Sequence, residues 1–569
     1  MSLDLFITIG GKAGDGSFLI GDILAKTFRL IGYNVLTYRD FPSNIRGLPT
    51  YYSVRVSDKP IYAVKDFIDY LVAFEFEAVE YLKRYCSSST VIIYDNSIRD
   101  IKDIGIKSYG IPFKKMSINN LGSELFKNTI ALGALTYILG VDEKHVLNVL
   151  MEAFMRRSGE IMDKNVKAYK IGREYAIENI KIREEVGGAI GREGFLLSGN
   201  EAIAIGAIIA GCRFYAGYPI TPATEIMELL IMHMPKYQGV AIQVEDEIAA
   251  INMAIGASYA GLRAMTATSG PGFSLMAESL SLAGMTELPV VIVYVQRAGP
   301  STGIATKMEQ SDTLQALFSG HGEFPRIVLT PGTVEEAFYM TTEAFNLAEK
   351  IQCPVIILID QFIAQNRETV NTIDLSRIRI DRGKLIISEV IGDYRRYEIT
   401  DDGISPRTIP LVKGGIYLAN SNEHDERGYT AENPWIRESM VNKRLKKLEV
   451  AKKILEEKFP HKIYGFKNAK IAFIGYGSVH GVVLEVVERL NVKEPKAKYL
   501  QLRYLWPFPL ENVNKFIHDV DRIYVVEHNA QGQLSELVRW ATGVRANKIL
   551  KYDGRAFRPV DIMKAVGSG

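Results

Sequence analysis

Cysteine is scarce in this chain, and the few that occur are far apart. The 569 residues include only Cys86, Cys212 and Cys353. Their spacing excludes a CxxC pair, a zinc knuckle and a local run of iron–sulfur ligands. A chain this long can bury its core without disulfides or a structural metal, and so little cysteine is typical of a reducing compartment. We therefore expect a cytoplasmic protein.

The sequence also lacks an excess of either charge and any long apolar run. Its 68 Lys and Arg residues nearly balance its 66 Asp and Glu residues, for a net charge of +2, which excludes the charge pattern of a general nucleic-acid binder. Apolar stretches such as residues 288–295 are too short to cross a bilayer. The first residues lack the basic start and apolar core of a signal peptide. We expect neither nucleic acid nor a membrane as a partner.

Strand-like and helical segments alternate along most of the chain. Residues 5–9 are strand-like, residues 17–30 have a helical period, and residues 35–38 are strand-like again, an order typical of a parallel sheet. Further apolar runs at 239–244, 288–295 and 354–359 are typical of buried parallel strands. The predicted fold class is α/β.

The length suggests three to four domains at roughly 150 residues each. Changes in composition divide the chain into three α/β blocks and one polar insert or linker: blocks at 1–185, 195–375 and 466–569, and the insert at 380–465. The insert ends in a basic helical segment, residues 441–458. Within it, His424 lies among acidic residues, a pattern that favours a surface or lid loop over a metal site.

A glycine-rich turn follows the first strand-like segment. Residues 10–16 (GGKAGDG) precede a helix, so their backbone N–H groups can contact a phosphate, but they fit neither G-x-G-x-x-G nor the P-loop. Gly14-Asp15-Gly16 followed by Asn44 also matches the loose pattern in which Asp and Asn hold the Mg²⁺ of thiamine diphosphate. From the residues alone a metal site and a structural or anion-binding turn both remain open, and the loop context favours the turn.

A second cluster lies where the strand-like runs of the middle block end. In residues 217–225 (GYPITPATE), two prolines fix a rigid turn that holds the Thr221 hydroxyl, although a plain helix-entry turn would also explain them. Three more motifs follow in order: EDE at 245–247, SGPG at 269–272 and QRAGPSTG at 296–303. Open α/β sheets bind ligands at such strand ends. Because apolar residues follow Glu247, we expect it to face inward, and Glu245 and Asp246 to face solvent or a partner.

This order of motifs resembles the α subunit of 2-oxoacid:ferredoxin oxidoreductases. The N-terminal block resembles that family's γ-type domain, here fused ahead of the α part. Residues 506–509 (WPFP) and 527–529 (EHN) resemble its transketolase-like C-terminal domain. The resemblance implies three α/β domains: a Rossmann-like γ-type domain, a pyrimidine-type domain that binds thiamine diphosphate, and a transketolase C-terminal-like domain.

The resemblance also implies roles for individual residues. Glu247 matches the glutamate that hydrogen-bonds the aminopyrimidine ring of thiamine diphosphate, and Arg297 matches the arginine that pairs with the substrate carboxylate. These two, with Thr221 and Thr306, are the implied catalytic residues. The implied substrate-binding residues are Tyr218, Thr221, Arg297 and Thr306, and the implied cofactor-binding residues are Pro219, Ile220, Glu247 and Gly270. The family commonly has proline where this chain has Ala305, which implies a looser turn and a changed substrate range.

The implied reaction is the CoA-dependent oxidative decarboxylation of a 2-oxoacid, pyruvate or 2-oxoglutarate, with electrons passed to ferredoxin. The resemblance implies thiamine diphosphate shared with a separate β subunit, which carries the Mg²⁺ and diphosphate site and the [4Fe–4S] cluster, and no metal site on this chain. Two alternatives remain open. One is another thiamine-diphosphate enzyme, of transketolase or dehydrogenase E1 type, and the other is a non-catalytic nucleotide-binding subunit.

Overall fold

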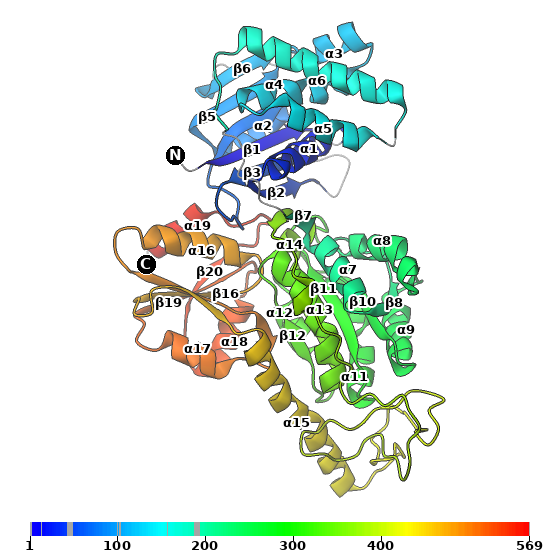
Figure 1. Ribbon diagram of the computed structural model, residues 1–569. Coiled ribbons are helices and arrows are strands. Elements are labelled where there is room, and N and C mark those ends of the chain that lie inside the picture. The colour runs from blue at the N-terminus through cyan, green and yellow to red at the C-terminus, as the bar shows by residue number, and fades with distance from the viewer. Residues whose placement is uncertain are drawn as a thin grey trace. The chain divides into compact units, whose positions relative to one another are not determined.

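The computed structural model describes residues 3–12, 14–42, 49–98, 101, 104–155, 157–186 and 194–567 (Figure 1). The chain folds into two compact units. Unit 1 comprises Met1–Leu197, Asn366–Ile373 and Arg558–Asp561, and unit 2 comprises Ser198–Gln365, Asp374–Phe557 and Ile562–Gly569. Two later segments thus return to unit 1, a feature of which the sequence gives no sign.

Unit 1 is built on one eight-stranded mixed sheet, in the order β6-β5-β4-β1-β3-β2-β14-β7. Its strands are β1 (Asp4–Gly11), β2 (Asn34–Asp40), β3 (Thr50–Ser57), β4 (Ile68–Ala73), β5 (Cys86–Asp95), β6 (Lys107–Ile111), β7 (Phe195–Ser198) and β14 (Arg367–Val370). β1 pairs parallel with β4 but antiparallel with β3, and β2 is also antiparallel to β3. β1 and β2 therefore run in the same direction, as predicted, but they are not neighbours, because β3, buried at every residue, lies between them. The sheet predicted to be parallel is therefore mixed.

The helices of unit 1 include one pair in close backbone contact. They are α1 (Ser17–Leu30), α2 (Phe76–Leu82), α3 (Phe113–Leu121), α4 (Lys127–Ile138), α5 (Glu143–Phe154) and α6 (Gly159–Asn179). Helix α1 has the predicted bounds. A Cβ atom on Gly172 of α6 would lie 1.8 Å from the carbonyl oxygen of Ile130 in α4, so glycine is required for α4 and α6 to pack together.

Unit 2 contains two sheets, of which the larger has seven strands in the order β18-β12-β13-β11-β10-β8-β9. Its strands are β8 (Cys212–Gly217), β9 (Val240–Gln243), β10 (Arg263–Thr268), β11 (Val290–Gln296), β12 (Ile327–Leu329), β13 (Pro354–Asp360) and β18 (Tyr504–Trp506). All neighbours are parallel except β12 and β18. The buried parallel strands predicted at 288–295 and 354–359 are confirmed as β11 and β13. The strand predicted at 239–244 is present and parallel as β9, but its predicted burial is wrong, because β9 is the last strand of the sheet and none of its residues is buried.

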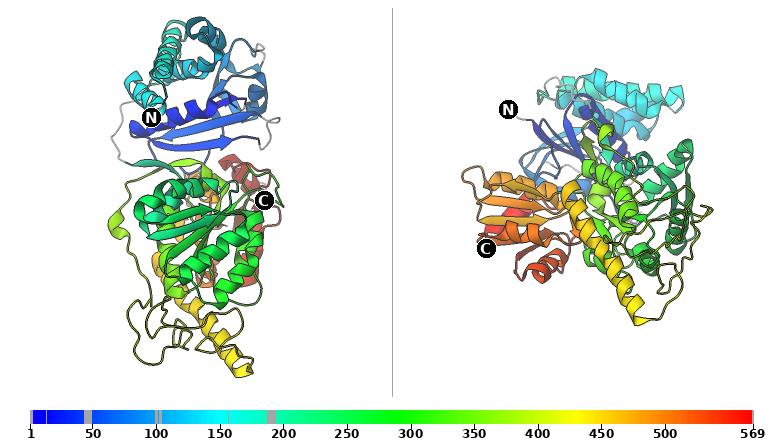
Figure 2. Two further views of the ribbon diagram at one scale, coloured as in Figure 1. Left: turned by 90° about the vertical axis from the view of Figure 1, so that its right-hand side faces the viewer. Right: turned by 60° about the horizontal axis from the view of Figure 1, so that its bottom comes forward.

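Helices cover both faces of this sheet (Figure 2). They are α7 (Gly199–Ile209), α8 (Thr224–His233), α9 (Glu247–Tyr259), α10 (Gly270–Leu275), α11 (Ala277–Met285), α12 (Thr313–Phe318), α13 (Val334–Ile351) and α14 (Gln361–Gln365). Along β11, Val291 and Val293 join the core formed with α7, α8 and α13, whereas Ile292 and Tyr294 join the core formed with α9, α10 and α11. Burial on both faces explains why β11 reads as a continuous apolar run.

The smaller sheet of unit 2 has five strands in the order β15-β17-β16-β19-β20. They are β15 (Lys462–Gly465), β16 (Ile471–Gly475), β17 (Ala497–Gln501), β19 (Arg522–Glu527) and β20 (Asn547–Leu550). The helices of this part of the chain are α15 (Pro434–Lys458), α16 (Val479–Leu490), α17 (Leu510–Ile517), α18 (Gln533–Thr542) and α19 (Pro559–Gly567). Strand β18 comes from the same stretch of sequence yet pairs with β12 in the larger sheet, so the two sheets of unit 2 are interlocked.

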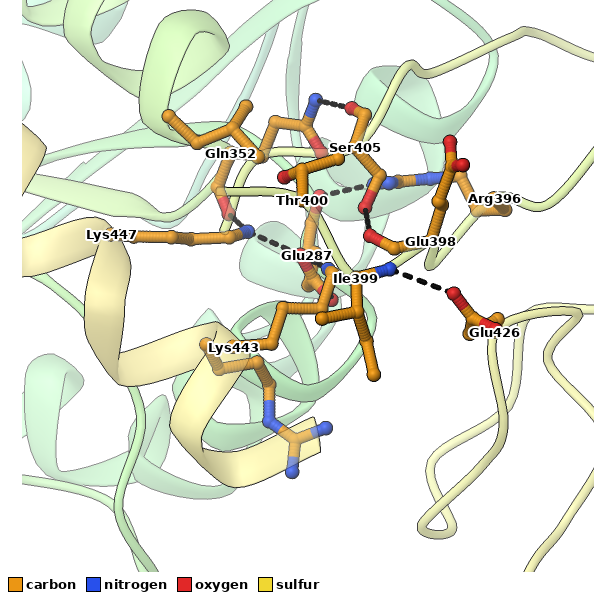
Figure 3. Close-up of polar contacts among 12 residues, drawn as sticks. Glu287, Gln352, Arg396, Glu398, Ile399, Thr400, Ser405, Glu426, Lys443 and Lys447 are labelled. Carbon is orange, nitrogen blue, oxygen red and sulfur yellow. Dashed lines mark hydrogen bonds and ion pairs between the residues drawn. The ribbon is translucent and has the colours of Figure 1, made fainter. Parts of the chain in front are cut away.

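Buried ion pairs attach the polar insert to the larger sheet (Figure 3). The Nζ atom of Lys443, in α15, lies 2.7 and 2.8 Å from the two carboxylate oxygens of Glu287, and Lys447, one turn later, pairs with the same carboxylate. All three side chains are fully buried. Arg396 of the insert donates to the Glu287 carbonyl oxygen at 2.7 Å. The basic helix predicted from the sequence therefore directs some of its charge inward.

A second buried carboxylate has the same arrangement. Glu349, in α13, pairs with Arg263 at 3.0 Å, with Arg407 at 3.3 Å and with Arg382 at 2.6 Å. Arg382 and Arg407 belong to the insert, whereas Arg263 begins β10. Glu287 and Glu349 thus fix the insert at two points.

His424 is not in a surface loop, and that prediction is wrong. Its side chain is fully buried, and its ring packs on Tyr397 with 4.1 Å between ring centroids. Its Nδ1 atom lies 2.9 Å from the carbonyl oxygen of Asn422, and burial lowers the pKa of the imidazole. His424 is therefore part of a small core inside the insert, which the acidic residues beside it in the sequence conceal.

Candidate functional site

The start of α7 holds the proline-rich loop that follows β8. The Nδ2 atom of the buried Asn200 donates to the carbonyl oxygen of Pro222 and to the carboxylate of Glu225, both at 2.9 Å. Gly217, the last residue of β8, accepts a hydrogen bond from the Val244 N–H at 3.0 Å, which ties the loop to the segment leading into α9. These contacts fix the backbone of the loop, as its prolines predict.

Arg297 directly follows β11 and reaches this loop. Its Nη1 atom donates to the Thr221 carbonyl oxygen at 2.7 Å, and the residue is only 6% exposed. Its Nε atom is buried without a hydrogen-bond partner, and among the described residues no carboxylate forms an ion pair with it. Burial lowers the pKa of the guanidinium and Asp312 opposes that shift, but arginine stays charged. A buried cation without a partner costs free energy until an anion pairs with it.

A short hairpin brings Thr306 back beside Arg297. The Ala298 N–H donates to the Lys307 carbonyl oxygen at 2.8 Å, and the Ile304 N–H donates to the Ala298 carbonyl oxygen at 3.0 Å. The residue after Thr306 is therefore hydrogen-bonded to the residue after Arg297, and the hairpin returns the chain to the vicinity of Arg297. The Thr306 Oγ1 atom is buried and has no partner in the described part of the chain. Ala305, at the position where we expect a looser turn than a proline would give, lies in this hairpin.

Glu247 is the first residue of α9, and its two acidic neighbours are placed differently. Asp246 is the N-cap, and its carboxylate accepts from the Ala249 N–H at 2.8 Å. Glu245 is exposed. Glu247 is 5% exposed, and burial, reinforced by the nearby Asp246 charge, raises the pKa of its carboxyl group. Glu247 faces inward and Glu245 faces outward, as the sequence predicts.

The turn between β10 and α10 lies against Glu247. A Cβ atom on Gly272 would come within 2.4 Å of Glu247 Oε1 and 2.1 Å of Thr268 Oγ1. A Cβ atom on Gly270 would come within 2.8 Å of Asp312 Oδ2. Glycine at both positions therefore lets two carboxyl groups approach the backbone of one turn, which explains the SGPG motif physically.

The predicted residues gather at one edge of the larger sheet, without all touching one another. They follow β8, β9, β10 and β11, which are neighbouring parallel strands, so they meet where such sheets bind ligands. Arg297 and Thr221 are hydrogen-bonded, whereas no contact that the structure records links Glu247 to either of them. In the loop, Tyr218 is 40% exposed, and Pro219 and Ile220 are half-buried.

Gln310 is a residue that the sequence did not single out. Its backbone N–H donates to the carbonyl oxygen of His528 at 2.6 Å. Its Nε2 atom donates to Asp360 at 3.0 Å and to the Tyr476 carbonyl oxygen at 3.1 Å. Gln310 thus joins the segment after Thr306 to both sheets of unit 2. Its position shortly after the QRAGPSTG motif was the available signal, but its contact with the EHN segment is known only from the fold.

The Asp15 side chain connects the glycine-rich turn of unit 1 to itself and to the start of α4. An oxygen of the Asp15 carboxylate accepts from the Lys12 N–H at 2.9 Å, and the other pairs with Lys127 at 3.2 Å. Asn44, the second half of the loose magnesium pattern, lies outside the described residues. Within the described ranges, no three His, Cys, Asp or Glu residues are grouped so as to hold a metal ion.

Large apolar side chains are exposed around the candidate site. They come from the proline-rich loop, from α9, from α10 and from the hairpin: Tyr218, Ile248, Met253, Leu275 and Ile304, each between 40% and 49% exposed. Such a concentration on the surface indicates an interaction site. In the described ranges no helix is both long and apolar enough to traverse a bilayer.

Three family models together match most of the chain. A model described as pyruvate ferredoxin/flavodoxin oxidoreductase matches residues 7–175, the thiamine-diphosphate-binding model of pyruvate flavodoxin/ferredoxin oxidoreductase matches residues 205–443, and core domain II of pyruvate:ferredoxin oxidoreductase matches residues 469–562. The second model includes every residue predicted for the site.

Relatives and a solved structure match over nearly the whole length. The α subunit of 2-oxoacid:ferredoxin oxidoreductase 2 from Aeropyrum pernix is 33% identical over 99% of this chain and 97% of its own. The 2-oxoglutarate synthase subunit KorA of Methanothermobacter thermautotrophicus is 37% identical over 66% of this chain and 98% of its own. The structure of 2-oxoglutarate:ferredoxin oxidoreductase from Magnetococcus marinus, with 2-oxoglutarate, coenzyme A and succinyl-CoA bound, covers 99% of both chains at 35% identity and a TM-score of 0.94. This chain therefore belongs to the 2-oxoacid:ferredoxin oxidoreductase family and is an α subunit of that family.

Proposed function

We propose that this chain, with a second subunit, oxidises a 2-oxoacid in a CoA-dependent reaction. The 2-oxoacid and CoA become acyl-CoA, CO₂ and a proton, and two electrons reduce two oxidised one-electron ferredoxins. The observation that carries the proposal is the state of Arg297, a buried cation at the strand ends of the larger sheet with which no described carboxylate forms an ion pair. The relatives' names and the ligands of the Magnetococcus marinus enzyme support it.

Arg297 is arranged to take the substrate carboxylate. The hydrogen bond from Nη1 to the Thr221 carbonyl oxygen fixes the orientation of the guanidinium. The unpartnered Nε atom remains available, and a planar guanidinium can bind a carboxylate through two parallel hydrogen bonds. The buried hydroxyl of Thr306, also without a partner in the described structure, offers a further donor from the adjacent backbone. Binding a carboxylate here would satisfy two buried groups together.

Glu247 fits the aminopyrimidine end of thiamine diphosphate. Its carboxyl group is desolvated, has a raised pKa, and lies over a turn in which Gly272 leaves it room. A carboxyl group of this kind can hold a proton at a ring nitrogen or exchange it with that nitrogen. When bound, thiamine diphosphate supplies the nucleophilic carbon and the electron sink that decarboxylation requires. The chain's own part is to position and to exchange the proton.

The diphosphate and Mg²⁺ site and the [4Fe–4S] cluster would belong to the β subunit. A cluster held by four cysteines cannot come from a chain that has three, and Cys212 and Cys353 are buried. The exposed apolar residues around the site provide the surface that the β subunit would cover. Ferredoxin would then receive electrons from that subunit.

The test is an assay of the co-expressed subunits with pyruvate and with 2-oxoglutarate, with and without CoA, using a dye as electron acceptor. Arg297→Ala should lower kcat/KM for the oxoacid by about 10² or more, because loss of one partner of a buried charge pair costs about 2–5 kcal/mol. Arg297→Lys should restore only part of it, since lysine lacks the planar fork.

Arg377→Ala is the matched control. Arg377 is exposed, and its guanidinium packs 4.4 Å from the ring centroid of Tyr339, so its loss should leave kcat/KM unchanged. An unchanged kcat/KM in Arg297→Ala would show that the carboxylate is bound elsewhere. Oxidation that proceeds equally well without CoA would favour another thiamine-dependent activity.

A further inference from the structure

A groove lies at the edge of the five-stranded sheet, on the side opposite the candidate site. Its volume is about 870 Å³, and it is bordered by the end of α15, by β15 and α17, and by the amino-terminal ends of β16 and β17. The carboxyl-terminal side of the same sheet carries His528, whose carbonyl oxygen contacts Gln310. None of the residues predicted for the thiamine site lines the groove.

A buried lysine forms part of the groove's floor. Lys498, the second residue of β17, is 6% exposed and lies on the same face of the strand as the buried Leu500. A residue in such a position is normally apolar. Its Nζ atom has only a long contact, 3.4 Å, to the Lys467 carbonyl oxygen, and lies 4.9 Å from the ring centroid of Phe516. Among the described residues no carboxylate forms an ion pair with it.

In the described structure the acidic residues of the groove form no ion pair with Lys498. Asp519 Oδ2 lies 2.8 Å from the His518 ring, a contact that is an ion pair only when the imidazole is protonated, and Glu511 pairs with Lys452 at 2.8 Å. Burial lowers the pKa of Lys498, Asp519 opposes that shift, and Lys470 adds to it.

Two further lysines line the groove without a carboxylate partner in the described chain: Lys467 and Lys515. With Lys498 they make three ammonium groups in one groove. Of the three acidic residues that line it, Glu511 is paired with Lys452, Asp519 contacts the His518 ring, and Glu456 has no ion pair in the described structure.

We propose that this groove binds a small phosphorylated molecule, with its phosphoryl group held by Lys498 and with Lys467 and Lys515 at the rim. A phosphoryl group carries more than one negative charge and several acceptor oxygens, which suits several ammonium groups that line one groove. The apolar side chains of Pro460 and Ile463 border the same space and can contact the remainder of the molecule. The volume is within the range of small-molecule sites.

A simpler account is that Lys498 only extends its ammonium group to water while its methylenes are buried. The two accounts differ in measurable ways. A ligand site predicts saturable anion binding that depends on Lys498, whereas a hydrated lysine predicts none.

The test is isothermal titration calorimetry on the full chain, in complex with its β subunit, with inorganic phosphate and with ADP as separate probes. Lys498→Met keeps a linear side chain beside Leu500 and Phe516 and should weaken binding of the preferred probe at least tenfold. Lys493→Met, at an exposed position of the same domain that does not line the groove, should bind as the wild type does. ADP binding more tightly than phosphate would indicate a nucleotide, and equal affinity would indicate phosphate itself.

Two results would overturn the proposal: no saturable binding of either probe up to millimolar concentration, or equal affinity in the wild type and Lys498→Met. If Lys498→Met does not fold, the double variant Lys467→Ala/Lys515→Ala, at exposed positions, replaces it with the same expected loss. Neither negative result bears on the proposed oxoacid activity, which the Arg297 assay tests separately.

Discussion

Two buried glutamates in unit 2 have opposite surroundings. Glu247, at the candidate site, has no described cation beside it, and burial raises the pKa of its carboxyl group. Glu287, below the insert, lies among Lys443, Lys447 and Arg396. Burial alone would raise its pKa too, but these cations outweigh that effect and hold it well below its usual range. The same type of side chain is therefore shifted toward its protonated form at one place and held in its charged form at the other.

This difference separates a reactive group from a structural one. A buried charge surrounded by opposite charges anchors the segments that carry them, and breaking such a cluster is costly. A buried titratable group without such compensation is a candidate for chemistry. The same contrast holds for two buried arginines. Arg263 is paired with Glu349, whereas Arg297 has no carboxylate partner in the described residues. Both exceptions lie at the ligand-binding edge of the larger sheet.

The largest expected effect is on catalysis at Glu247. Glu247→Gln keeps the size of the side chain but cannot exchange a proton, so turnover of the complex should fall by roughly 10² to 10⁴. Stability should hardly change, since no ion pair is lost. The direct measurement is exchange of the thiazolium C2 proton with deuterium, which should be slowed. Glu245→Gln, at an exposed position, is the control and should alter turnover only a few-fold; a larger defect there would mean that the wrong carboxylate has been chosen.

Glu287→Gln should show the reverse pattern and mainly destabilise the fold. The substitution leaves Lys443, Lys447 and Arg396 buried together without a counter-charge, at a cost of about 3–5 kcal/mol. A clear drop in the urea or thermal midpoint of unit 2 should follow. Glu389→Gln removes an exposed ion pair with Lys413 and should cost about 1 kcal/mol or less. Equal unfolding midpoints for Glu287→Gln and Glu389→Gln would show that Glu287 does not stabilise the fold as a buried counter-charge.

Gly272→Ala tests whether space beside Glu247 matters. The added methyl group would collide with Glu247 Oε1 and Thr268 Oγ1, so we expect a loss of about 1–3 kcal/mol in stability and at least a tenfold lower turnover. Gly256→Ala, in α9, meets nothing within 4 Å and should instead stabilise the helix by about 0.5–1 kcal/mol. Activity retained by Gly272→Ala would mean that Glu247 tolerates displacement.

The smallest effect is a pH dependence from Lys443. Burial lowers the pKa of Lys443 to about 7. The negative charge of Glu287 opposes this shift, and the positive charge of Lys447 adds to it. Between about pH 7 and 10.5 the Lys443 side chain therefore holds more protons in the unfolded chain than in the folded one. The free energy by which burial of Lys443 destabilises the fold is largest below pH 7 and disappears as the pH rises. Relative to Lys443→Met, the wild type should gain stability from pH 7 to 9 in urea titrations. Lys446→Met, at an exposed position of α15, should parallel the wild type, and parallel profiles for all three would refute the shift.

Local patterns in the sequence predicted the elements that carry the site. The period of residues 17–30, the apolar runs of β11 and β13, and the inward direction of Glu247 are all present in the structure. Each depends on neighbours within one element or one turn. The predicted neighbours of β1 and the surface position of His424 failed because both depend on residues far away in the chain.

The sequence by itself determined the α/β class, the order of the motifs and the residue types at the strand ends, because periodicity, proline and glycine act over a few residues. Only the tertiary structure decided which buried charged side chains have an ion-pair partner and which do not. It placed Arg297 against the Thr221 carbonyl oxygen rather than against a carboxylate, and it surrounded Glu287 with the lysines of a helix more than 150 residues later. Charge state in a protein interior is set by desolvation and by neighbours in space, and those neighbours are known only when the chain has folded.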